Sequence, residues 1–229
     1  MSIGKEKIVS VSIDPVPDRE LLPYLKEMQE YKVDYIHCDV MDGNFVPKVT
    51  YDNKYIEIIN KKTIIPLDVH LMIEHPEKHI DKYLDAGANI LTVHYEAYTT
   101  RKDLVKDLDH IRERGALAGV AICPGTEVNN VVDFLNHVDV ILLMGVVPGY
   151  SGQAFIDNVY LKIKMLDNIR KQFNFKFILA VDGGITKEVS EEIKLLGADM
   201  IVSGTYIYES DQRKRTIRLL RLPASASEV

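Results

Sequence analysis

The chain has 229 residues, of which 46% are hydrophobic and 27% charged, and its net charge is -6. This composition excludes collagen, coiled coil and disorder, and the negative charge argues against a nucleic-acid-binding protein, which usually presents a basic face. No apolar run approaches the roughly 18–20 residues of a membrane span, and the first seven residues lack the apolar stretch of a signal peptide. We therefore expect a cytoplasmic protein that contacts neither membrane nor nucleic acid.

The domain organisation follows from the absence of any linker within the sequence. We expect one domain over residues 1–222, followed by a loose tail at 223–229 that lacks apolar bulk. Cys38 and Cys123 lie in apolar segments without the spacing of a metal motif, so both are expected to be buried thiols.

Short β-branched runs alternate with segments of helical spacing along the whole chain. The predicted strands are 8–13, 35–41, 64–72, 90–94, 118–122, 138–144, 175–181 and 200–203. Strict alternation of strand and helix predicts an α/β protein with a parallel sheet covered by helices. Eight units favour a closed (β/α)8 TIM barrel. An open doubly wound sheet is the alternative, although the glycine-rich nucleotide motifs typical of it are missing.

Polar residues gather where the predicted strands end, which is the edge at which barrel enzymes place functional groups. The two-residue period of a strand puts a histidine and a carboxylate of strand 35–41 on one face. A histidine of strand 64–72 and a carboxylate after strand 175–181 reach the same edge. These residues are His37, Asp39, His70 and Asp182. Imidazole and carboxylate suit zinc, iron, manganese or cobalt, so the set predicts one divalent metal ion, with hydrogen-bonded His–Asp pairs as the alternative.

Three glycine-rich loops also follow strands on this edge, at 148–153, 182–184 and 203–205. Barrels commonly bind phosphate at the loops after strands seven and eight, through backbone N–H groups. Any one of these loops could be a simple turn, but three on neighbouring strands favour an anion site.

Six motifs together resemble the ribulose-phosphate 3-epimerases, a family of metal-dependent (β/α)8 barrels. They are residues 37–47 (HCDVMDGNFVP), 67–72 (LDVHLM), 94–97 (HYEA), 124–126 (PGT), 148–153 (PGYSGQ) and 181–184 (VDGG). The resemblance spans nearly the whole chain. It implies epimerisation at carbon 3 of a ketose phosphate, most simply D-ribulose 5-phosphate to D-xylulose 5-phosphate in the pentose phosphate pathway, and we expect a homo-oligomer.

The resemblance also implies roles for individual residues. His37, Asp39, His70 and Asp182 would bind the metal, and Ser12 and His70 would contact substrate. The methionines that share the parity of these residues, Met41, Met72 and Met144, would form the floor of the site unless they are simply core. The residues that would line the phosphate end are Gly149, Tyr150, Ser151, Gly152, Gly183, Gly184, Gly204 and Thr205.

The chemistry explains the pair of aspartates. A proton next to a carbonyl is too weakly acidic for an unaided carboxylate, so a metal would be needed to stabilise the enediolate. Inversion requires a proton acceptor on one face of the carbon and a donor on the other. We assign Asp39 as the base and Asp182 as the acid, with the roles exchanged in reverse.

Several residues depart from the family pattern: Asp14, Lys48, Gly145, Ser151, Ala180 and Thr205. Asp14 replaces the usual leucine and shares the parity of Ser12, so it is expected to point inward beside Lys48 and tune sugar specificity. The alternative is that the strand ends earlier and Asp14 is a turn residue. Thr205 also occurs in the allulose-6-phosphate 3-epimerases, so a hexulose-phosphate epimerase is the alternative activity, followed by a non-catalytic sugar-phosphate sensor. An orotidine-phosphate type of decarboxylase would need a lysine that residues 39–42 lack.

Overall fold

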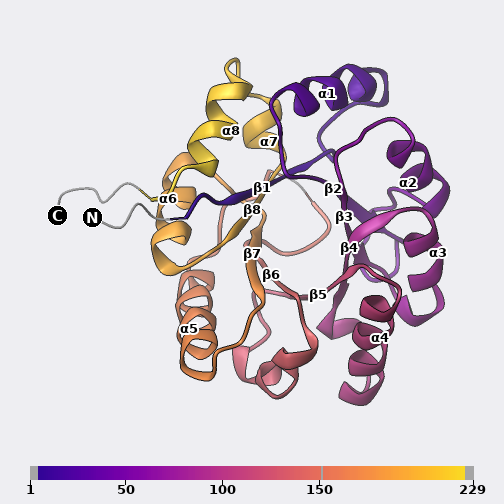
Figure 1. The fold of residues 1–229 in the computed structure, drawn as a ribbon, viewed down its shortest axis with the longest axis vertical. Helices are drawn as coiled ribbons and strands as arrows, with labels where there is room; N and C mark the ends of the chain where they lie inside the picture. Colours follow the sequence, from indigo (N-terminus) through magenta and orange to yellow (C-terminus); the bar gives the residue numbers. More distant parts are fainter. Residues whose placement is uncertain (1–4, 151, 225–229) are drawn as a thin grey trace.

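The structure of the protein, a computed structural model, describes residues 5–150 and 152–224, and within them eight parallel strands form one closed barrel (Figure 1). The strands are β1 Ile8–Ser12, β2 Tyr35–Met41, β3 Leu67–Met72, β4 Ala88–His94, β5 Leu117–Ile122, β6 Val140–Met144, β7 Ile178–Asp182 and β8 Met200–Ser203. They pair in chain order, and β8 also pairs with β1. The predicted (β/α)8 barrel is confirmed, and the open sheet is wrong.

Helices ring the outside of the barrel (Figure 1). They are α1 Asp18–Glu30, α2 Asn53–Asn60, α3 Ile80–Asp85, α4 Arg101–Glu113, α5 Asn158–Phe173, α6 Lys187–Leu196, α7 Thr205–Tyr208 and α8 Arg213–Arg221, with 3-10 turns at Pro76–Lys78, Tyr95–Ala97, Val128–Asn130 and Val132–His137. The side chains of Thr100 and Thr186 cap the starts of α4 and α6, and Gly197 ends α6 with a φ of 114°. No helix in the described residues is long and apolar enough to cross a membrane.

The core has two layers, because successive side chains of a strand point to opposite faces. In β6, Val140, Leu142 and Met144 point into the barrel interior, whereas Ile141 and Leu143 pack under the surrounding helices. The same alternation in β2 and β3 sends His37, Asp39 and His70 inward and buries their apolar neighbours outside. The hydrophobic pattern therefore fixes which polar side chains meet inside the barrel.

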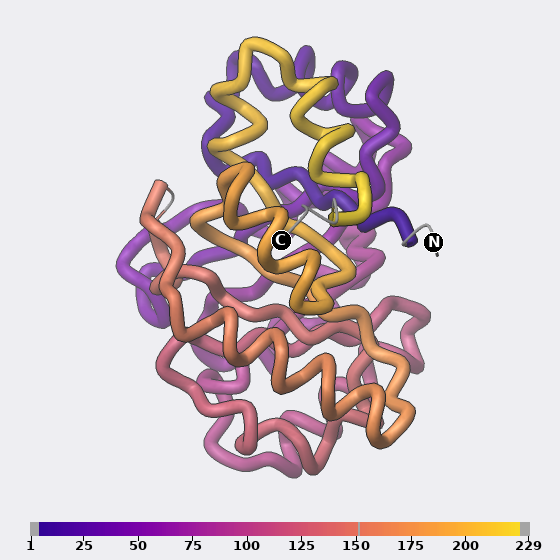
Figure 2. Tube along the Cα trace, turned by 90° about the vertical axis from the view of Figure 1, so that its left-hand side faces the viewer, coloured from indigo at the N-terminus to yellow at the C-terminus, as the bar shows by residue number. Residues whose placement is uncertain are grey.

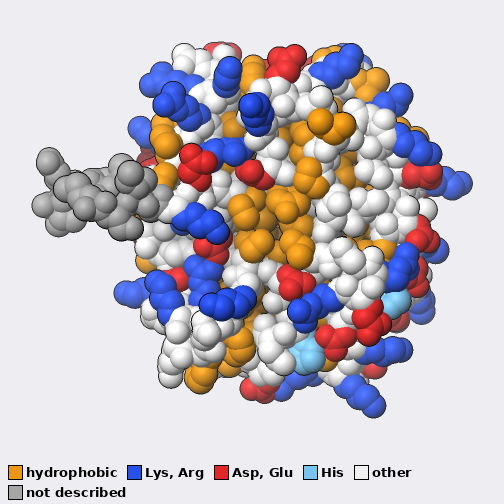
Figure 3. Space-filling model, viewed as in Figure 1, with side chains coloured by type: hydrophobic (Ala, Val, Ile, Leu, Met, Phe, Trp, Pro, Cys, Tyr) orange, Lys and Arg blue, Asp and Glu red, His pale blue; other side chains and the backbone are white. Residues whose placement is uncertain are grey.

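The two ends of the barrel differ. Figure 2 shows the loop after β6 at one end and the start of β1 at the other. At the strand-start end, the interior is closed by the partly buried Ile8, Tyr35, Leu117 and Ile178. Figure 3 shows apolar side chains at the centre of that face and charges of both signs around them. The opposite end, where the strands finish, is the end that carries the polar residues.

Strand boundaries differ from the prediction mainly at strand starts. The strand predicted from residue 64 begins at Leu67, because Pro66 has no N–H for the ladder, and Ile64 is 84% exposed. The strand predicted over 175–181 runs from Ile178 to Asp182. Of the tail predicted to be loose, residues 225–229 lie outside the described residues.

Candidate active site

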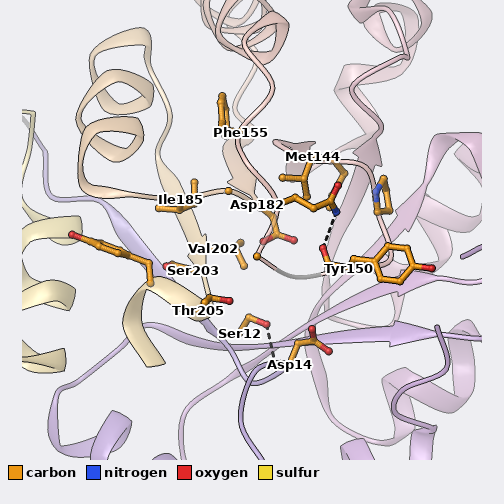
Figure 4. A pocket seen from close by; sticks show the side chains of 18 of the residues that line it. Ser12, Asp14, Met144, Tyr150, Phe155, Asp182, Ile185, Val202, Ser203 and Thr205 are labelled. Atoms are coloured by element: carbon orange, nitrogen blue, oxygen red, sulfur yellow. Dashed lines mark hydrogen bonds between the residues drawn. The ribbon is translucent and has the colours of Figure 1, made fainter. Parts of the chain in front are cut away.

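A cavity of about 490 Å³ opens where the strands end. Side chains from the ends of β1, β6, β7 and β8 and from the loops that follow them surround it (Figure 4). Asp39 and Asp182 lie on its wall, so the cavity reaches the predicted cluster of ligands.

The four predicted metal ligands come together at the inner end of this cavity. One ligand atom from each of His37, Asp39, His70 and Asp182 lies within 4.8 Å of the others. Asp39 Oδ1 is 3.1 Å from His37 Nε2 and 3.0 Å from His70 Nδ1, and His37 Nε2 is 3.8 Å from Asp182 Oδ2. Ligands bound at about 2 Å from one ion lie about 3 Å apart, so the spacing and donor types of this set fit a divalent ion.

Neighbouring residues orient these side chains. His37 Nδ1 is 2.6 Å from Asp68 Oδ2, which also accepts a 2.8 Å hydrogen bond from the Ser10 hydroxyl. A carboxylate behind a histidine holds the ring and leaves the lone pair of its other nitrogen for a metal. Ser12 donates to Asp39 Oδ2 at 3.2 Å. The strand ends therefore present an ordered set of ligands.

The two active-site carboxyl groups differ in their proton affinity. Burial raises the pKa of Asp182 to about 7, and the charge of Asp39 adds to this effect. Burial also opposes ionisation of Asp39, but His37 and His70 outweigh it and hold the pKa of Asp39 well below its usual range. Burial lowers the pKa of His70 to about 4, so its ring is neutral near pH 7. Near neutral pH, therefore, Asp39 is ionised and Asp182 is poised to carry a proton.

Most residues predicted to contact substrate line the cavity. They are Ser12, Met41, Met72, Met144, Gly149, Tyr150, Gly152, Gly183, Gly184, Gly204 and Thr205. His70 is instead fully buried behind the lining, and Ser151 lies outside the described residues.

Asp14 combines the two alternatives drawn from the sequence. β1 ends at Ser12, so Asp14 lies in the turn after the strand, and its N–H donates to the Ser12 hydroxyl at 3.3 Å. Its side chain nevertheless lines the cavity and is only 7% exposed. Lys48 Nζ lies 2.5 Å from Asp14 Oδ1. The Asp14 carboxylate on the cavity wall thus belongs to a partly buried ion pair.

The glycine loops form the other wall of the cavity. Gly183 and Gly184 have φ values of 96° and 68°, and a Cβ on Gly184 would come within 2.7 Å of the backbone nitrogen of Phe155. Only glycine fits this close approach. The nearby Ser203 hydroxyl is buried and has no hydrogen-bond partner among the described residues. Ser203 belongs to the loop at 203–205 that the sequence predicts as part of an anion site.

A group missed from the sequence lies behind His70. His70 Nε2 is 2.9 Å from His94 Nε2, and His94 Nδ1 is 3.0 Å from Glu96 Oε2. The motif at 94–97 had contributed only to the family resemblance. The spacing of this motif does not indicate that His94 contacts His70 of another strand, with Glu96 behind it.

Comparisons with known proteins agree with this geometry. A model of the ribulose-phosphate 3 epimerase family matches residues 8–208. The chain is 39% identical over 197 residues to the ribulose-phosphate 3-epimerase of Aquifex aeolicus (strain VF5), which covers 86% of this chain and 87% of that protein. It is 38% identical over 198 residues to the enzyme of the same name from Bacillus subtilis (strain 168), covering 86% and 90%.

A solved structure supports the fold independently. The 3-hexulose-6-phosphate synthase of Salmonella typhimurium superposes with a TM-score of 0.66 at 18% identity, covering 93% of this chain and 96% of that one. At this low identity, the superposition shows a shared barrel fold and does not indicate a shared reaction.

Proposed function

The chain belongs to the ribulose-phosphate 3-epimerase family and is an epimerase, and from this premise we propose that it interconverts D-ribulose 5-phosphate and D-xylulose 5-phosphate with one divalent metal ion. The family membership confirms the resemblance drawn from the six motifs. The observation that carries the proposal is the pair of buried aspartates on the cavity wall, whose environments move their pKa values in opposite directions.

These two aspartates divide the proton transfer. Asp39, ionised by its two histidine neighbours, accepts the proton from carbon 3, and Asp182 returns a proton to the other face of the carbon. In the reverse direction the roles exchange. When bound, the divalent ion supplies the positive charge that stabilises the oxygens of the enediolate.

The residues around the cavity suit the rest of the substrate. The backbone at Gly183, Gly184 and Gly204 and the side chain of Thr205 lie at the end expected to take the phosphate, where the unpartnered Ser203 hydroxyl is a further donor. Backbone and hydroxyl donors bind phosphate without lysine or arginine. This matches a chain whose net charge is -6.

A hexulose-phosphate epimerase is the second candidate, and the ion pair between Asp14 and Lys48 favours it. Asp14 adds hydrogen-bonding oxygens to the cavity wall where the family pattern has leucine, and Lys48, where the pattern has asparagine, pairs with it. A sugar with an additional hydroxyl would use such groups. The non-catalytic sensor is disfavoured because both aspartates and both histidines are present.

Turnover of a panel of sugar phosphates tests the proposal. Metal-free protein would be reconstituted separately with zinc, manganese, cobalt and ferrous iron, and each form assayed with D-ribulose 5-phosphate and D-allulose 6-phosphate. We expect the larger kcat/KM with D-ribulose 5-phosphate. A larger value with D-allulose 6-phosphate would transfer the assignment to the second candidate, and no turnover of either sugar by any metal form would overturn both.

A further inference from the structure

We propose that Glu96 is a positioning residue, which acts through His94 to set the tautomer of His70 and so presents the Nδ1 lone pair of His70 to the metal ion. The inference rests on the metal centre of the proposed function. It assigns to that centre a carboxylate that touches neither the ligands nor the cavity.

Two short contacts connect Glu96 to the metal cluster, one from Glu96 to His94 and one from His94 to His70. Glu96 Oε2 lies 3.0 Å from His94 Nδ1, and His94 Nε2 lies 2.9 Å from His70 Nε2. The two ring centroids are 4.9 Å apart, which at this nitrogen separation means that the rings meet at their edges. His70 Nδ1 then faces Asp39 Oδ1 at 3.0 Å. Both rings are fully buried, so water does not compete for these nitrogens.

Hydrogen-bonding rules give this path one direction. An ionised carboxylate only accepts, so Glu96 requires a proton on His94 Nδ1. A neutral His94 then has a lone pair on Nε2, which requires a proton on the facing Nε2 of His70. His70 is in turn left with a lone pair on Nδ1, which faces the ionised Asp39 and is accommodated when the metal ion lies between these two ligand atoms. The opposite tautomers would turn the Nδ1 lone pair of His94 toward the negative charge of Glu96.

Glu96 is itself held so that only one oxygen is available to His94. Its Oε1 accepts a 2.8 Å hydrogen bond from the N–H of Cys123 and a short one from the hydroxyl of Thr126. The Lys162 side chain from α5 binds the carbonyl oxygens of Cys123, Pro124 and Thr126 at 3.2, 2.5 and 2.6 Å. These bonds hold the loop after β5 in place, and the loop in turn holds the carboxylate of Glu96.

The tautomer of the other histidine, His37, is set by a carboxylate in direct contact with it. Asp68 Oδ2 lies 2.6 Å from His37 Nδ1, which leaves His37 Nε2 for the ion. Each histidine of the cluster therefore has a carboxylate behind it. Asp68 contacts His37 directly, whereas Glu96 reaches His70 through the ring of His94. Such partners orient a ligand and raise its affinity for the metal.

Glutamine at position 96 would have the same shape as glutamate, but an NH2 donor would replace one of the two accepting oxygens. If its carbonyl faces His94, its NH2 group meets the N–H of Cys123, and two donors oppose each other. If the amide is rotated by 180°, its NH2 group donates to His94 Nδ1 and the His94 proton moves to Nε2. That proton then faces the proton on His70 Nε2. Either result leaves a buried donor unpaired, which a carboxylate avoids.

The test is a zinc titration of metal-free protein by competition with a coloured chelator, for the wild type, Glu96→Gln and the control Glu77→Gln. Glu77 shares a surface hollow with Glu96, and its partner within residues 5–150 and 152–224 is the exposed His75, at 3.3 Å. We expect Glu96→Gln to weaken zinc binding by about 10–100-fold, as loss of such partners does, with Glu77→Gln within about twofold of wild type. Ring 15N spectra of zinc-loaded wild type should show the proton of His94 on Nδ1 and that of His70 on Nε2.

The outcomes separate the inference from the metal centre. Zinc affinity unchanged in Glu96→Gln, or a wild-type His94 with its proton on Nε2, would overturn the role of Glu96 and leave the metal centre in place. Wild-type protein that binds no zinc would overturn the metal centre itself. The tautomer of His37, set by Asp68, should be the same in the wild type and in Glu96→Gln. A change there would overturn the inference that Glu96 acts through His94 and His70.

Discussion

Asp39 and Asp182 lie in one cluster but have different surroundings. Asp39 accepts from Ser12 and faces both histidine ligands at 3.0–3.1 Å, whereas Asp182 faces His37 at 3.8 Å and is dominated by burial. Placing both on the cavity wall gives the site one carboxyl group that is ionised near neutral pH and one that can carry a proton there. The sequence predicted this pair from strand parity, but the difference between the two pKa values depends on packing that parity does not contain.

Asp39→Asn and Asp182→Asn should each lower kcat for D-ribulose 5-phosphate by at least about 100-fold, because each removes a proton carrier. Turnover would be measured together with the metal content of each variant, since both residues also belong to the proposed set of ligands. Asp109→Asn, which alters a surface aspartate paired with His137, is the control. An active-site variant that retains more than a tenth of wild-type turnover would contradict the assignment of that aspartate.

Asp14→Leu should raise the kcat/KM for D-ribulose 5-phosphate relative to that for D-allulose 6-phosphate, because leucine offers no hydrogen bond to an additional hydroxyl. Lys48→Met is the matched variant, since it leaves the Asp14 carboxylate without its cation. That partly buried charge should weaken binding of both anionic sugars. Relative rates that do not change in Asp14→Leu would show that Asp14 is a turn residue without influence on specificity.

Helices and loops of the barrel hold the site from outside. α5 contributes Lys162, which is only 5% exposed and binds carbonyl oxygens of the loop after β5. The strands were predictable at this scale because short β-branched runs alternate along the chain with segments of helical spacing. The role of Lys162 was not predictable, since a lysine in a helical segment usually lies in solvent, and only the packing of α5 on the barrel reveals its partners.

Lys162→Met should lower the free energy of unfolding by about 2 kcal/mol, because three carbonyl oxygens, one buried and two partly buried, lose a charged donor. Urea denaturation would measure the change. Lys164→Met alters an exposed lysine of the same helix and should change stability by less than about 0.5 kcal/mol. Equal stabilities of the two variants would mean that the Lys162 hydrogen bonds make no net contribution.

At the scale of the whole molecule, closure of the barrel brings distant sequence segments to one point. β2, β3 and β7 carry the four predicted ligands, and the structure brings their side chains together as strand order and parity predict. The two carboxylates that the sequence did not assign to the site, Asp68 and Glu96, act through contacts between neighbouring strands or loops. Those contacts depend on rotamers and loop paths, which a periodic pattern does not specify.

Removal of the metal should affect both stability and activity. Elemental analysis should find about one divalent ion per chain, and chelation should abolish turnover and lower the melting temperature, because an ion bound only by the folded state stabilises it. Adding the ion back should restore both. Full activity of protein with less than about a tenth of an ion per chain would contradict a metal-dependent reaction.

The central claim is that two carboxylates exchange protons with carbon 3 of the sugar, and the most direct measurement is the reaction in D2O followed by proton NMR. The account predicts that deuterium appears at carbon 3 of the product, because the proton returned by Asp182 comes from a group that equilibrates with solvent. Product that retains only protium at carbon 3, under conditions where the active-site protons have exchanged, would contradict the account.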